Sequence, residues 1–497
     1  MSDEPGNEPL GEFPEGSEPD LLQARRRKLE RLRADGIDPF PPAFPGVKPI
    51  AEVRGAHVGL PPGEETDASY RVAGRLTQRR GQGKMAFLDL VDRSGRIQLQ
   101  ARADVLGSER MERLADLDLG DLIGVDGTVF VTRRGELSLR IDDYTVLAKS
   151  LRPPPDKHHG LRDVETRFRH RELDLMSSEE ARRLFVTRAR IITTLRRYLD
   201  DNGFVEVETP VLQPLYGGAM ARPFVTHHNA LHRDLYLRIA TELYLKRLLV
   251  GGLERVYEIG KNFRNEGVSF KHNPEFTVVE WYEAYADYED VMRRVEELLP
   301  QIAQAAGYEG QIDFTPPYRR VALVDAIRDA TGIDVSEHAD RDALAAAIRA
   351  AGLDMPTDDL TWPALVDDLF SKKVEPTLVQ PTFVIDFPKE ISPLAKDHRS
   401  KPGFVERFEA FAGGMEIANA FTELNDPDEQ RARFESQARL AREGDEEAQP
   451  YDEAFVEALE HGMPPAGGIG IGIDRLVMLM TGHQSIREIV LFPAMRD

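Results

Sequence analysis

The chain has 497 residues, a formal net charge of −22 and no cysteine. A chain of this length is expected to form about two or three domains around a large apolar core. The absence of cysteine excludes disulfides, thiolate catalysis and cysteine-ligated zinc, and it favours a reducing compartment such as the cytoplasm. No apolar run approaches the roughly 18 residues of a membrane span, so no membrane contact is expected. Because the net charge is negative, any contact with nucleic acid depends on local basic patches.

The N-terminal region divides into a tail and a basic helix. Residues 1–20 contain seven acidic residues, four prolines and no basic residue, which predicts a disordered acidic tail. Residues 21–64 are expected to form a basic helix and a linker, with Asp20 as the N-cap of the helix and Gly36 as its stop. The linker contains PFPPAFPG at 39–46. The basic side chains of the helix either contact phosphate or form a solvated face, and the sequence leaves both interpretations open.

Residues 65–152 show a succession of short strand patterns: YRVAGRLTQRR, MAFLDLVDRSGRIQLQA and DLIGVDGTVFVTRRGELSLRIDDYTVLA. Five strands with one short helix near 108–117 predict a small closed barrel of the oligonucleotide-binding type. Arg79, Arg80 and Lys84 lie near Phe87, and this combination suits base stacking with phosphate contacts. The alternative for Phe87 is a place in the barrel core, where phenylalanines in strands are usually buried.

Residues 153–497 read as one larger α/β unit. It begins with an amphipathic helix at 179–203 and the strand FVEVETPVL. Residues 308–380 alternate helical patterns with prolines and contain no candidate chemistry, so a peripheral helical insertion is expected there.

The stretch RVYEIGKNFRNEGVSFKHNPEFTVVEWYEAY, residues 255–285, predicts two strands joined by an unusually charged connection. Asn262 and Arg264 share a face of the first strand, whereas Phe263 is expected in the core. Alternation along the second strand places Phe276, Val278, Glu280 and Tyr282 on one face. An arginine fork binds two oxygens of a phosphate or carboxylate, and an aromatic ring stacks on a purine. A charged hairpin in water is the plainer alternative, but it would not require these side chains to converge.

Two further segments carry candidate chemistry. In GGIGIGIDR, residues 467–475, glycine alternates with isoleucine, so one strand face lacks side chains. A bare face of this kind indicates the close approach of a ligand or of another backbone. In RFEAFAGGMEIANAFTELND, residues 407–426, Gly413 and Gly414 predict a two-residue hairpin turn.

The register of this hairpin places two carboxylates on one face. Glu409 is expected opposite Ala418 and diagonal to Glu416, with Cβ atoms roughly 7 Å apart. Two carboxylates at that distance repel unless a cation lies between them, and Mg²⁺ bound to a triphosphate is suitable. A bulge between residues 416 and 419 is needed to bring Asn419, Phe421 and Glu423 to the same face.

Taken together, these segments resemble the class II lysyl-tRNA synthetases of bacterial type, a subclass IIb family. The resemblance is carried by GFVEVETPVL, the charged hairpin and GGIGIGIDR, and by the long matches GGAMARPFVTHHNALHRDLYLRIATELYLKRLLVGG and ANAFTELNDP. It extends from about residue 23 to the C-terminus. The implied fold is mixed α/β (α+β): a five-stranded OB-fold barrel, followed by a catalytic domain with an antiparallel sheet flanked by helices.

The resemblance also implies roles for individual residues. Arg264 is expected to hold the α-phosphate of ATP and the substrate carboxylate, and Arg475 the γ-phosphate, which makes these two arginines the catalytic residues. The expected ATP site consists of Arg264, Glu266, His272, Asn273, Phe276 and Arg475. The expected lysine site consists of Gly218, Glu242, Arg264, Glu280, Tyr282, Asn419 and Glu423. Glu409 and Glu416 are expected to ligate Mg²⁺, and Arg79, Phe87, Gln98 and Glu136 to read the anticodon.

The implied activity is that of a lysine-tRNA ligase, with L-lysine, ATP and the tRNA for lysine as substrates and a homodimer as the active form. An enzyme that lysylates a protein is one alternative, but it would not need an anticodon barrel. A non-catalytic RNA-binding relative is a second, although decay should have removed Arg264, Arg475 or the glutamate pair. An aspartate or asparagine synthetase is a third, and its pocket should be cationic rather than acidic.

Overall fold

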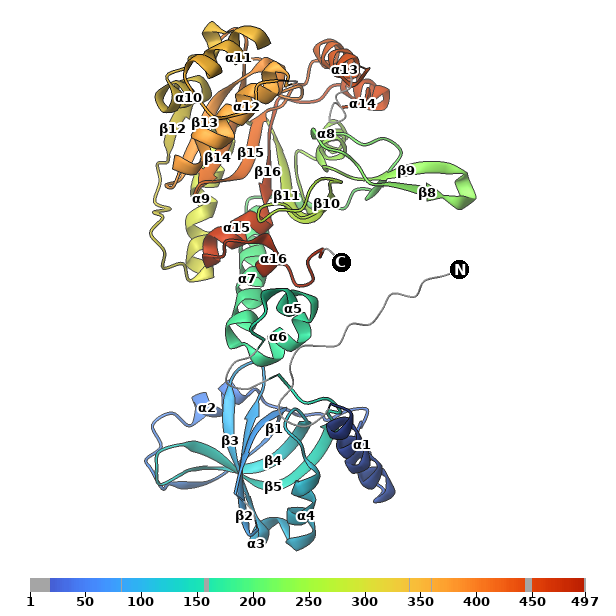
Figure 1. The fold of residues 1–497 in the computed structure, drawn as a ribbon, viewed down its shortest axis with the longest axis vertical. Coiled ribbons are helices and arrows are strands. Elements are labelled where there is room, and N and C mark those ends of the chain that lie inside the picture. The colour runs from blue at the N-terminus through green and yellow to red at the C-terminus, as the bar shows by residue number, and fades with distance from the viewer. Residues whose placement is uncertain are drawn as a thin grey trace. The chain divides into compact units, whose positions relative to one another are not determined.

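The computed structural model describes residues 18–81, 83–155, 161–338, 340–358, 360–442 and 449–495. Residues 1–17 of the predicted acidic tail lie outside this description. The chain folds into two compact units, which divide between Arg182 and Arg183 (Figure 1). No helix in the described ranges is long and apolar enough to cross a membrane.

The first unit is built around a closed barrel with the strand order β1-β2-β3-β5-β4, so the predicted OB-fold is confirmed. Its strands are β1 (Glu65–Arg80), β2 (Met85–Val91), β3 (Arg96–Arg102), β4 (Leu122–Val131) and β5 (Leu137–Ala148). Its helices are α1 (Glu18–Ala34), α2 (Ile50–Ala56), α3 (Ala103–Leu106), α4 (Ser108–Arg113), η1 (Leu114–Asp116), α5 (Val164–Arg169) and α6 (Arg171–Ser177). Inward-facing aliphatic residues such as Leu76, Leu88 and Leu99 fill the barrel.

Helix α1 differs in two respects from its prediction. It begins at Glu18, so Asp20 lies within the first turn and is not the N-cap; Gly36, with φ +75°, follows the helix as expected. Part of its basic face is structural, because buried Arg25 donates to the carbonyls of Leu119, Ser150 and Arg152. Lys28 forms an ion pair with Asp118 at 2.5 Å. These contacts hold α1 against the barrel.

The second unit contains an eight-stranded sheet with the order β12-β13-β14-β15-β16-β11-β10-β6. Its strands are β6 (Val205–Glu206), β10 (Arg255–Phe263), β11 (Glu275–Ala284), β12 (Arg319–Ala322), β13 (Thr382–Pro388), β14 (Phe404–Ala412), β15 (Met415–Thr422) and β16 (Ala466–Gly472). The pairs β12·β13 and β10·β6 are parallel, and the others are antiparallel. A smaller sheet has the order β7-β9-β8, with β7 (Leu212–Gln213), β8 (Val225–His228) and β9 (Arg233–Leu237).

Helices flank the large sheet, as predicted, whereas the short η2 connects β8 and β9 of the smaller sheet. The helical segments of the second unit, in chain order, are α7 (Glu179–Asp201), η2 (Asn229–Leu231), α8 (Glu242–Val250), α9 (Tyr288–Ala306), α10 (Leu323–Thr331), η3 (Val335–Glu337), α11 (Arg341–Ala350), α12 (Trp362–Lys373), η4 (Glu375–Thr377), η5 (Lys389–Ile391), α13 (Pro427–Arg442), α14 (Glu453–Glu460), α15 (Ile473–Thr481) and α16 (Ile486–Ile489). Residues Ile191 of α7, Trp281 of β11 and Val295 of α9 meet in one core. The segment 308–380 is not purely helical, because its strand β12 forms one edge of the large sheet.

Candidate active site

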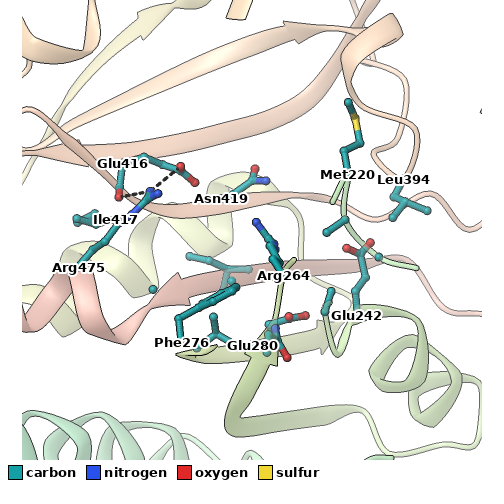
Figure 2. A pocket seen from close by; sticks show the side chains of 18 of the residues that line it. Met220, Glu242, Arg264, Phe276, Glu280, Leu394, Glu416, Ile417, Asn419 and Arg475 are labelled. Atoms are coloured by element: carbon teal, nitrogen blue, oxygen red, sulfur yellow. Dashed lines mark hydrogen bonds and ion pairs between the residues drawn. The ribbon is translucent and has the colours of Figure 1, made fainter. Parts of the chain in front are cut away.

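A cavity of about 370 Å³ opens over the centre of the large sheet, lined by β10, β11, β15, β16 and the loop between β10 and β11. Twelve of the residues predicted for the ATP, lysine and metal sites line it: Gly218, Glu242, Arg264, Glu266, His272, Asn273, Phe276, Glu280, Tyr282, Glu416, Asn419 and Arg475. Glu409 and Glu423 are not among the lining residues. Residues from positions 218 to 475 therefore meet in one place, as Figure 2 shows for part of the set.

The β10–β11 hairpin places an arginine beside an aromatic ring. Asn262 pairs with Phe276 in the antiparallel register, and both line the cavity, whereas Trp281 on the opposite face is fully buried in the core. The alternation predicted for β11 is therefore confirmed. Phe263 is a correction: it is half-buried and belongs to no core cluster of the described residues.

Arg264 is the central cation of the cavity. Its guanidinium carbon lies 5.1 Å from the centre of the Phe276 ring, and Figure 2 shows it between Phe276 and Asn419. Burial lowers the pKa of Arg264 below its ordinary value, an effect that Glu266 opposes. Its buried Nε has no hydrogen-bond partner among the described residues. A half-buried cation with an unused buried donor favours an anionic ligand, such as a phosphate or a carboxylate.

A second arginine lies at the other edge of the cavity. Nη1 of Arg475, in α15, donates to the Glu416 carboxylate at 2.9 Å, and its Nη2 lies 3.3 Å from Nε2 of His272. Burial and the neighbouring cations lower the pKa of His272, so the ring stays neutral and its Nε2 accepts from Arg475. The loop and α15 are thereby joined at the place expected to hold a triphosphate.

Helix α15 is anchored by the residue before Arg475. The buried Asp474 accepts the backbone N–H of Thr277 at 2.7 Å and pairs with Arg188 of α7 at the same distance. One carboxylate therefore ties α15 to β11 and α7. This contact fixes the position at which Arg475 enters the cavity.

Three carboxylates gather at the opposite end of the site: Glu242 of α8, Glu280 of β11 and Glu423 after β15. Their exposed fractions are 6%, 7% and 0%. Glu280 accepts the N–H of Thr241 at 3.1 Å and the hydroxyl of Tyr282 at 3.2 Å. Burial raises the pKa of all three above the ordinary value. A closed group of carboxylates is costly without a cation, so this end of the cavity favours a cationic ligand.

The glycines of β16 make room for this acidic group. A Cβ atom at Gly468 would lie 2.1 Å from Oε1 of Glu423 and 2.4 Å from the ring of Tyr282. A Cβ at Gly472 would come no closer than 3.9 Å, to the side chain of Arg475. The sequence predicted a strand face without side chains. At Gly468 the missing side chain leaves room for the carboxylate of Glu423, for the ring of Tyr282 and for the cavity beside them.

The β14–β15 hairpin confirms the predicted turn and bulge and corrects the predicted partner of Glu409. Gly413 and Gly414 form the turn, with φ of +63° and +71°, and Phe411 pairs with Glu416. A register shift follows, which leaves Ile417 as the extra residue between 416 and 419, where a bulge was predicted. Because of this bulge, Glu409 pairs with Asn419 and not with Ala418.

Glu409 already has a partner in this arrangement. Arg407 donates to Oε1 of Glu409 at 2.6 Å and to Oδ1 of Asn419 at 3.0 Å. Burial raises the pKa of Glu409 to about 8, and the nearby acids Glu416 and Asp367 contribute in the same direction while Arg407 opposes them. Within the described ranges no group of three or more acidic or histidine side chains is arranged to hold a metal ion. A metal at Glu409 and Glu416 would therefore need further ligands from a substrate or from water.

Residues 163–496 match the family tRNA synthetases class II (D, K and N). The chain belongs to this family of class II tRNA synthetases. Residues 70–147 separately match the OB-fold nucleic acid binding domain. The first match begins in the first unit, just before α5, and extends through the large sheet unit, and the second lies within the barrel.

The synthetase is similar over almost its whole length to proteins named lysine–tRNA ligase. It is 51% identical to that of Bacillus subtilis (strain 168) over 487 residues, which are 96% of this chain and 97% of the relative. It is 53% identical to that of Chloroflexus aurantiacus over 488 residues, with 96% and 98% covered. The relative from Roseiflexus castenholzii is 54% identical, with 96% and 99% covered.

The barrel of the synthetase presents the residues that were predicted to read an anticodon, with one exception. Phe87 is half-buried and belongs to no core cluster of the described residues, while its neighbours Ala86 and Leu88 are in the core. Phe87 pairs with Arg80 on one side and with Gln100 on the other. The base-stacking alternative for Phe87 is therefore favoured over the core alternative.

The exception is Arg79. A bulge between Leu76 and Gln78 shifts the register of β1, so Arg79 pairs with the buried Leu88 and donates to the carbonyl of Leu114 at 2.7 Å. Arg80 lies opposite Phe87 and forms an ion pair with Asp89 at 3.2 Å. Glu136 accepts from Arg96 at 3.4 Å, and Gln98 accepts the hydroxyl of Ser138 at 3.1 Å. Arg80, not Arg79, is the arginine on the face of Phe87.

Three contributors to the site were not predicted. Lys246 of α8 is fully buried between Glu242 and Glu423. Arg407 lines the cavity and binds two predicted site residues. Glu375, from the segment described above as an insertion without chemistry, pairs with Lys271 of the cavity loop. The sequence pattern did not identify these three residues. Arg407 and Glu375 meet Asn419 and Lys271 only in the folded chain, and the spacing of Glu242 and Lys246 is that of any ion pair on a charged helix.

Proposed function

We propose that this synthetase is a lysine-tRNA ligase, which joins L-lysine to its tRNA at the expense of ATP. The observation that carries the proposal is the buried group of Glu242, Glu280 and Glu423 at one end of a cavity whose centre holds Arg264. A long side chain that ends in an ammonium satisfies such carboxylates through three donors. An anionic or neutral amino acid would leave part of their charge unpaired, because Lys246 supplies a single ammonium to Glu242 and Glu423. The names and identities of the relatives support the same activity.

In the first step, an oxygen of the lysine carboxylate attacks the α-phosphorus of ATP. The bond from that phosphorus to its bridging oxygen breaks, which yields lysyl-adenylate and pyrophosphate. We assign the α-phosphate and the lysine carboxylate to Arg264, the adenine ring to Phe276 and the γ-phosphate to Arg475. Glu266, His272 and Asn273 complete the nucleotide site. No nucleophile or general base from the chain is required, so the site acts by positioning and by charge.

We assign the amino acid to the acidic end of the cavity. Gly218, Glu280 and Asn419 lie along its wall, with Glu242, Glu423 and Tyr282 around the side chain. In the second step, a ribose hydroxyl at the 3′ end of tRNA attacks the carbonyl of the adenylate, and AMP leaves. These assignments are supported by the shared cavity and by the unused donors of Arg264.

Mg²⁺ is the metal that best fits Glu409 and Glu416. Two carboxylates and few protein ligands suit this ion, which usually keeps several waters and binds substrate phosphates. The raised pKa of Glu409, about 8, supports a requirement for positive charge there. When bound, the ion would neutralise phosphate charge. Arg407 would orient Glu409, and Arg475 would orient Glu416.

We assign tRNA recognition to the barrel face that carries Arg80, Phe87, Gln98 and Glu136. An aromatic residue beside an arginine on a barrel strand provides stacking and phosphate contacts. Arg79 is expected to support the barrel instead, through Leu114. Aminoacylated tRNA is used in protein synthesis, which takes place in the cytoplasm. The proposed function therefore implies a cytoplasmic enzyme.

We further propose a homodimer. The short strand β6 forms an edge of the large sheet, and its Val205 is 49% exposed. Tyr285, which lines the same surface hollow as Val205, is 71% exposed, and Val186 of α7, the helix that precedes β6, is 52% exposed. An edge strand with exposed apolar neighbours favours pairing with a second copy. Sedimentation of an active species at the monomer mass of 55.9 kDa would contradict this assignment.

One assay tests the proposed activity: exchange of labelled pyrophosphate into ATP with each of the twenty amino acids in turn. Lysine should support exchange, and aspartate and asparagine should not. Transfer to tRNA then separates the alternatives. A protein-lysylating enzyme would activate lysine but leave tRNA uncharged, and a non-catalytic RNA-binding protein would support no exchange at all.

A further inference from the structure

Lys246 is a buried cation inside the acidic end of the cavity. It lies one helical turn after Glu242 in α8 and is 0% exposed. Its Nζ donates to Oε1 of Glu242 at 2.6 Å and forms an ion pair with Oε2 of Glu423. It also lies 5.2 Å from the centre of the Phe421 ring. Glu242, Phe421 and Gly468 line the cavity, whereas Lys246 and Glu423 are not among its lining residues and lie behind them.

The charges at this end do not balance. Glu242 and Glu423 provide two carboxylates, and Lys246 provides one ammonium. Glu280 accepts hydrogen bonds from two neutral donors, the N–H of Thr241 and the hydroxyl of Tyr282, and its charge is counted apart from that of this pair. Oε1 of Glu423 is buried without a hydrogen-bond partner among the described residues, and it faces the bare Gly468. The pair of carboxylates therefore lacks one positive charge, which a single further ammonium would supply.

Resting on the proposed function, we propose that Lys246 is a specificity-determining counter-ion of the lysine site. Its ammonium permanently neutralises one of the two negative charges of Glu242 and Glu423. The pocket for the substrate side chain therefore accepts one further ammonium and no more. Without it, Glu242 and Glu423 would repel each other in a closed site, and a proton would take its place. On Oε1 of Glu423, which has no hydrogen-bond partner among the described residues, that proton would block the ammonium of the substrate, which would have to displace it in order to bind.

The groups around Lys246 support this role. Glu242 on α8 and Glu423 after β15 keep its pKa above the ordinary value although burial lowers it. Burial raises the pKa of Glu423, and Glu242 and Glu280 of β11 add to this rise, whereas Lys246 opposes it. Arg407 of β14 acts on Glu242 in the same direction as Lys246, and Tyr282 of β11 faces Glu280. Lys246 is thus the charge that most directly opposes the rise in pKa of both carboxylates.

The test compares the wild-type enzyme with Lys246→Met, which keeps the length of the side chain and removes its charge. At pH 7 the lysine KM of Lys246→Met should be at least tenfold higher than that of the wild type. As pH rises, this KM should fall by about tenfold per pH unit, and the fall should continue to a higher pH than any change in the lysine KM of the wild type. The KM for ATP should be unchanged. Calorimetry in two buffers of different ionisation enthalpy should show more protons released per bound lysine than in the wild type.

Two further variants separate a charge effect from a packing effect. The double variant Lys246→Met with Glu423→Gln again leaves one net negative charge, so the pH dependence of the lysine KM should return toward that of the wild type. Leu249→Ala, a buried position later in the same helix, should lower stability without changing the pH profile.

The proposal is overturned if Lys246→Met keeps the wild-type lysine KM and proton release, or if Leu249→Ala reproduces its pH profile. Failure of the proposed function would look different: the wild-type enzyme itself would not exchange pyrophosphate with lysine.

Discussion

Lys271, in the loop between β10 and β11, forms an ion pair of 2.6 Å with Glu375, which lies 104 residues further along the chain. Both side chains are largely shielded, at 24% and 14% exposed. The segment 308–380 therefore contributes to the cavity through η4, although its sequence carries no recognisable chemistry. The ion pair tethers the loop that also presents His272 and Asn273.

Glu375→Gln should release this loop and raise the KM for ATP about fivefold, because an ion pair of this exposure contributes about 1 kcal/mol. Lys271→Gln should have a similar effect, and the double variant should add little to either. ATP–pyrophosphate exchange at varied ATP measures all three. Tighter ATP binding in Glu375→Gln would mean that Glu375 competes with the nucleotide for Lys271.

Glu423→Gln removes a charge from the lysine site while keeping the size of the side chain. We expect lysine activation to lose on the order of 3 kcal/mol, since one partner of a buried ion pair is removed. ATP binding, measured alone by calorimetry, should barely change. An equal loss of affinity for ATP and lysine, or a wild-type enzyme that prefers aspartate, would refute the specificity assignment.

Gly468→Ala should block the same site by steric overlap. The new methyl group would overlap Glu423 and Tyr282, and overpacking of this kind costs about 1–3 kcal/mol. The lysine KM should rise strongly. Gly467→Ala is the control, because its Cβ would meet Val291 at 2.7 Å, outside the cavity. It should lower the melting temperature and leave the lysine KM unchanged; the same KM effect in both variants would exclude a specific role for Gly468.

Phe87→Ala should weaken tRNA charging by about 1–3 kcal/mol, the usual contribution of one stacked base. Amino acid activation without tRNA should be unaffected. Leu88→Ala is a matched control, since Leu88 is in the barrel core and its truncation should lower stability. Equal losses in activation and charging by Phe87→Ala would show that Phe87 serves only the fold.

Arg80→Ala and Arg79→Ala should differ in their effects on tRNA binding and on the stability of the barrel. Loss of a phosphate contact at Arg80 should weaken tRNA binding and reduce the slope of log affinity against log salt concentration by about 1. Arg79→Ala should destabilise the barrel by removing the hydrogen bond to Leu114 and should keep the salt slope. Filter binding at several salt concentrations, together with thermal melting, checks both. A changed salt slope in Arg79→Ala alone would restore the original assignment.

Local pattern by itself predicted much of this protein. Alternation of side chains along β11 identified Phe276, Val278, Glu280 and Tyr282 as one face, because successive residues of a strand point to opposite sides whatever surrounds them. The Gly413–Gly414 turn was equally local, since two consecutive residues with positive φ specify a tight hairpin. The five short strands of the barrel were visible for the same reason.

Other features depended on the tertiary structure. The bulges at Leu76–Gln78 and Ile417 decided whether Arg79 or Arg80 lies beside Phe87 and which residue faces Glu409. One extra residue reverses the faces of a strand. The bulge in β15 was expected only because Asn419, Phe421 and Glu423 had to reach the face of Glu416, and the bulge in β1 was not predicted. Lys246 and Glu242 have the spacing of an ordinary surface ion pair on a helix. Only the packing of Glu423 and Phe421 against α8 makes Lys246 a buried counter-ion, because burial is a property of the assembled fold.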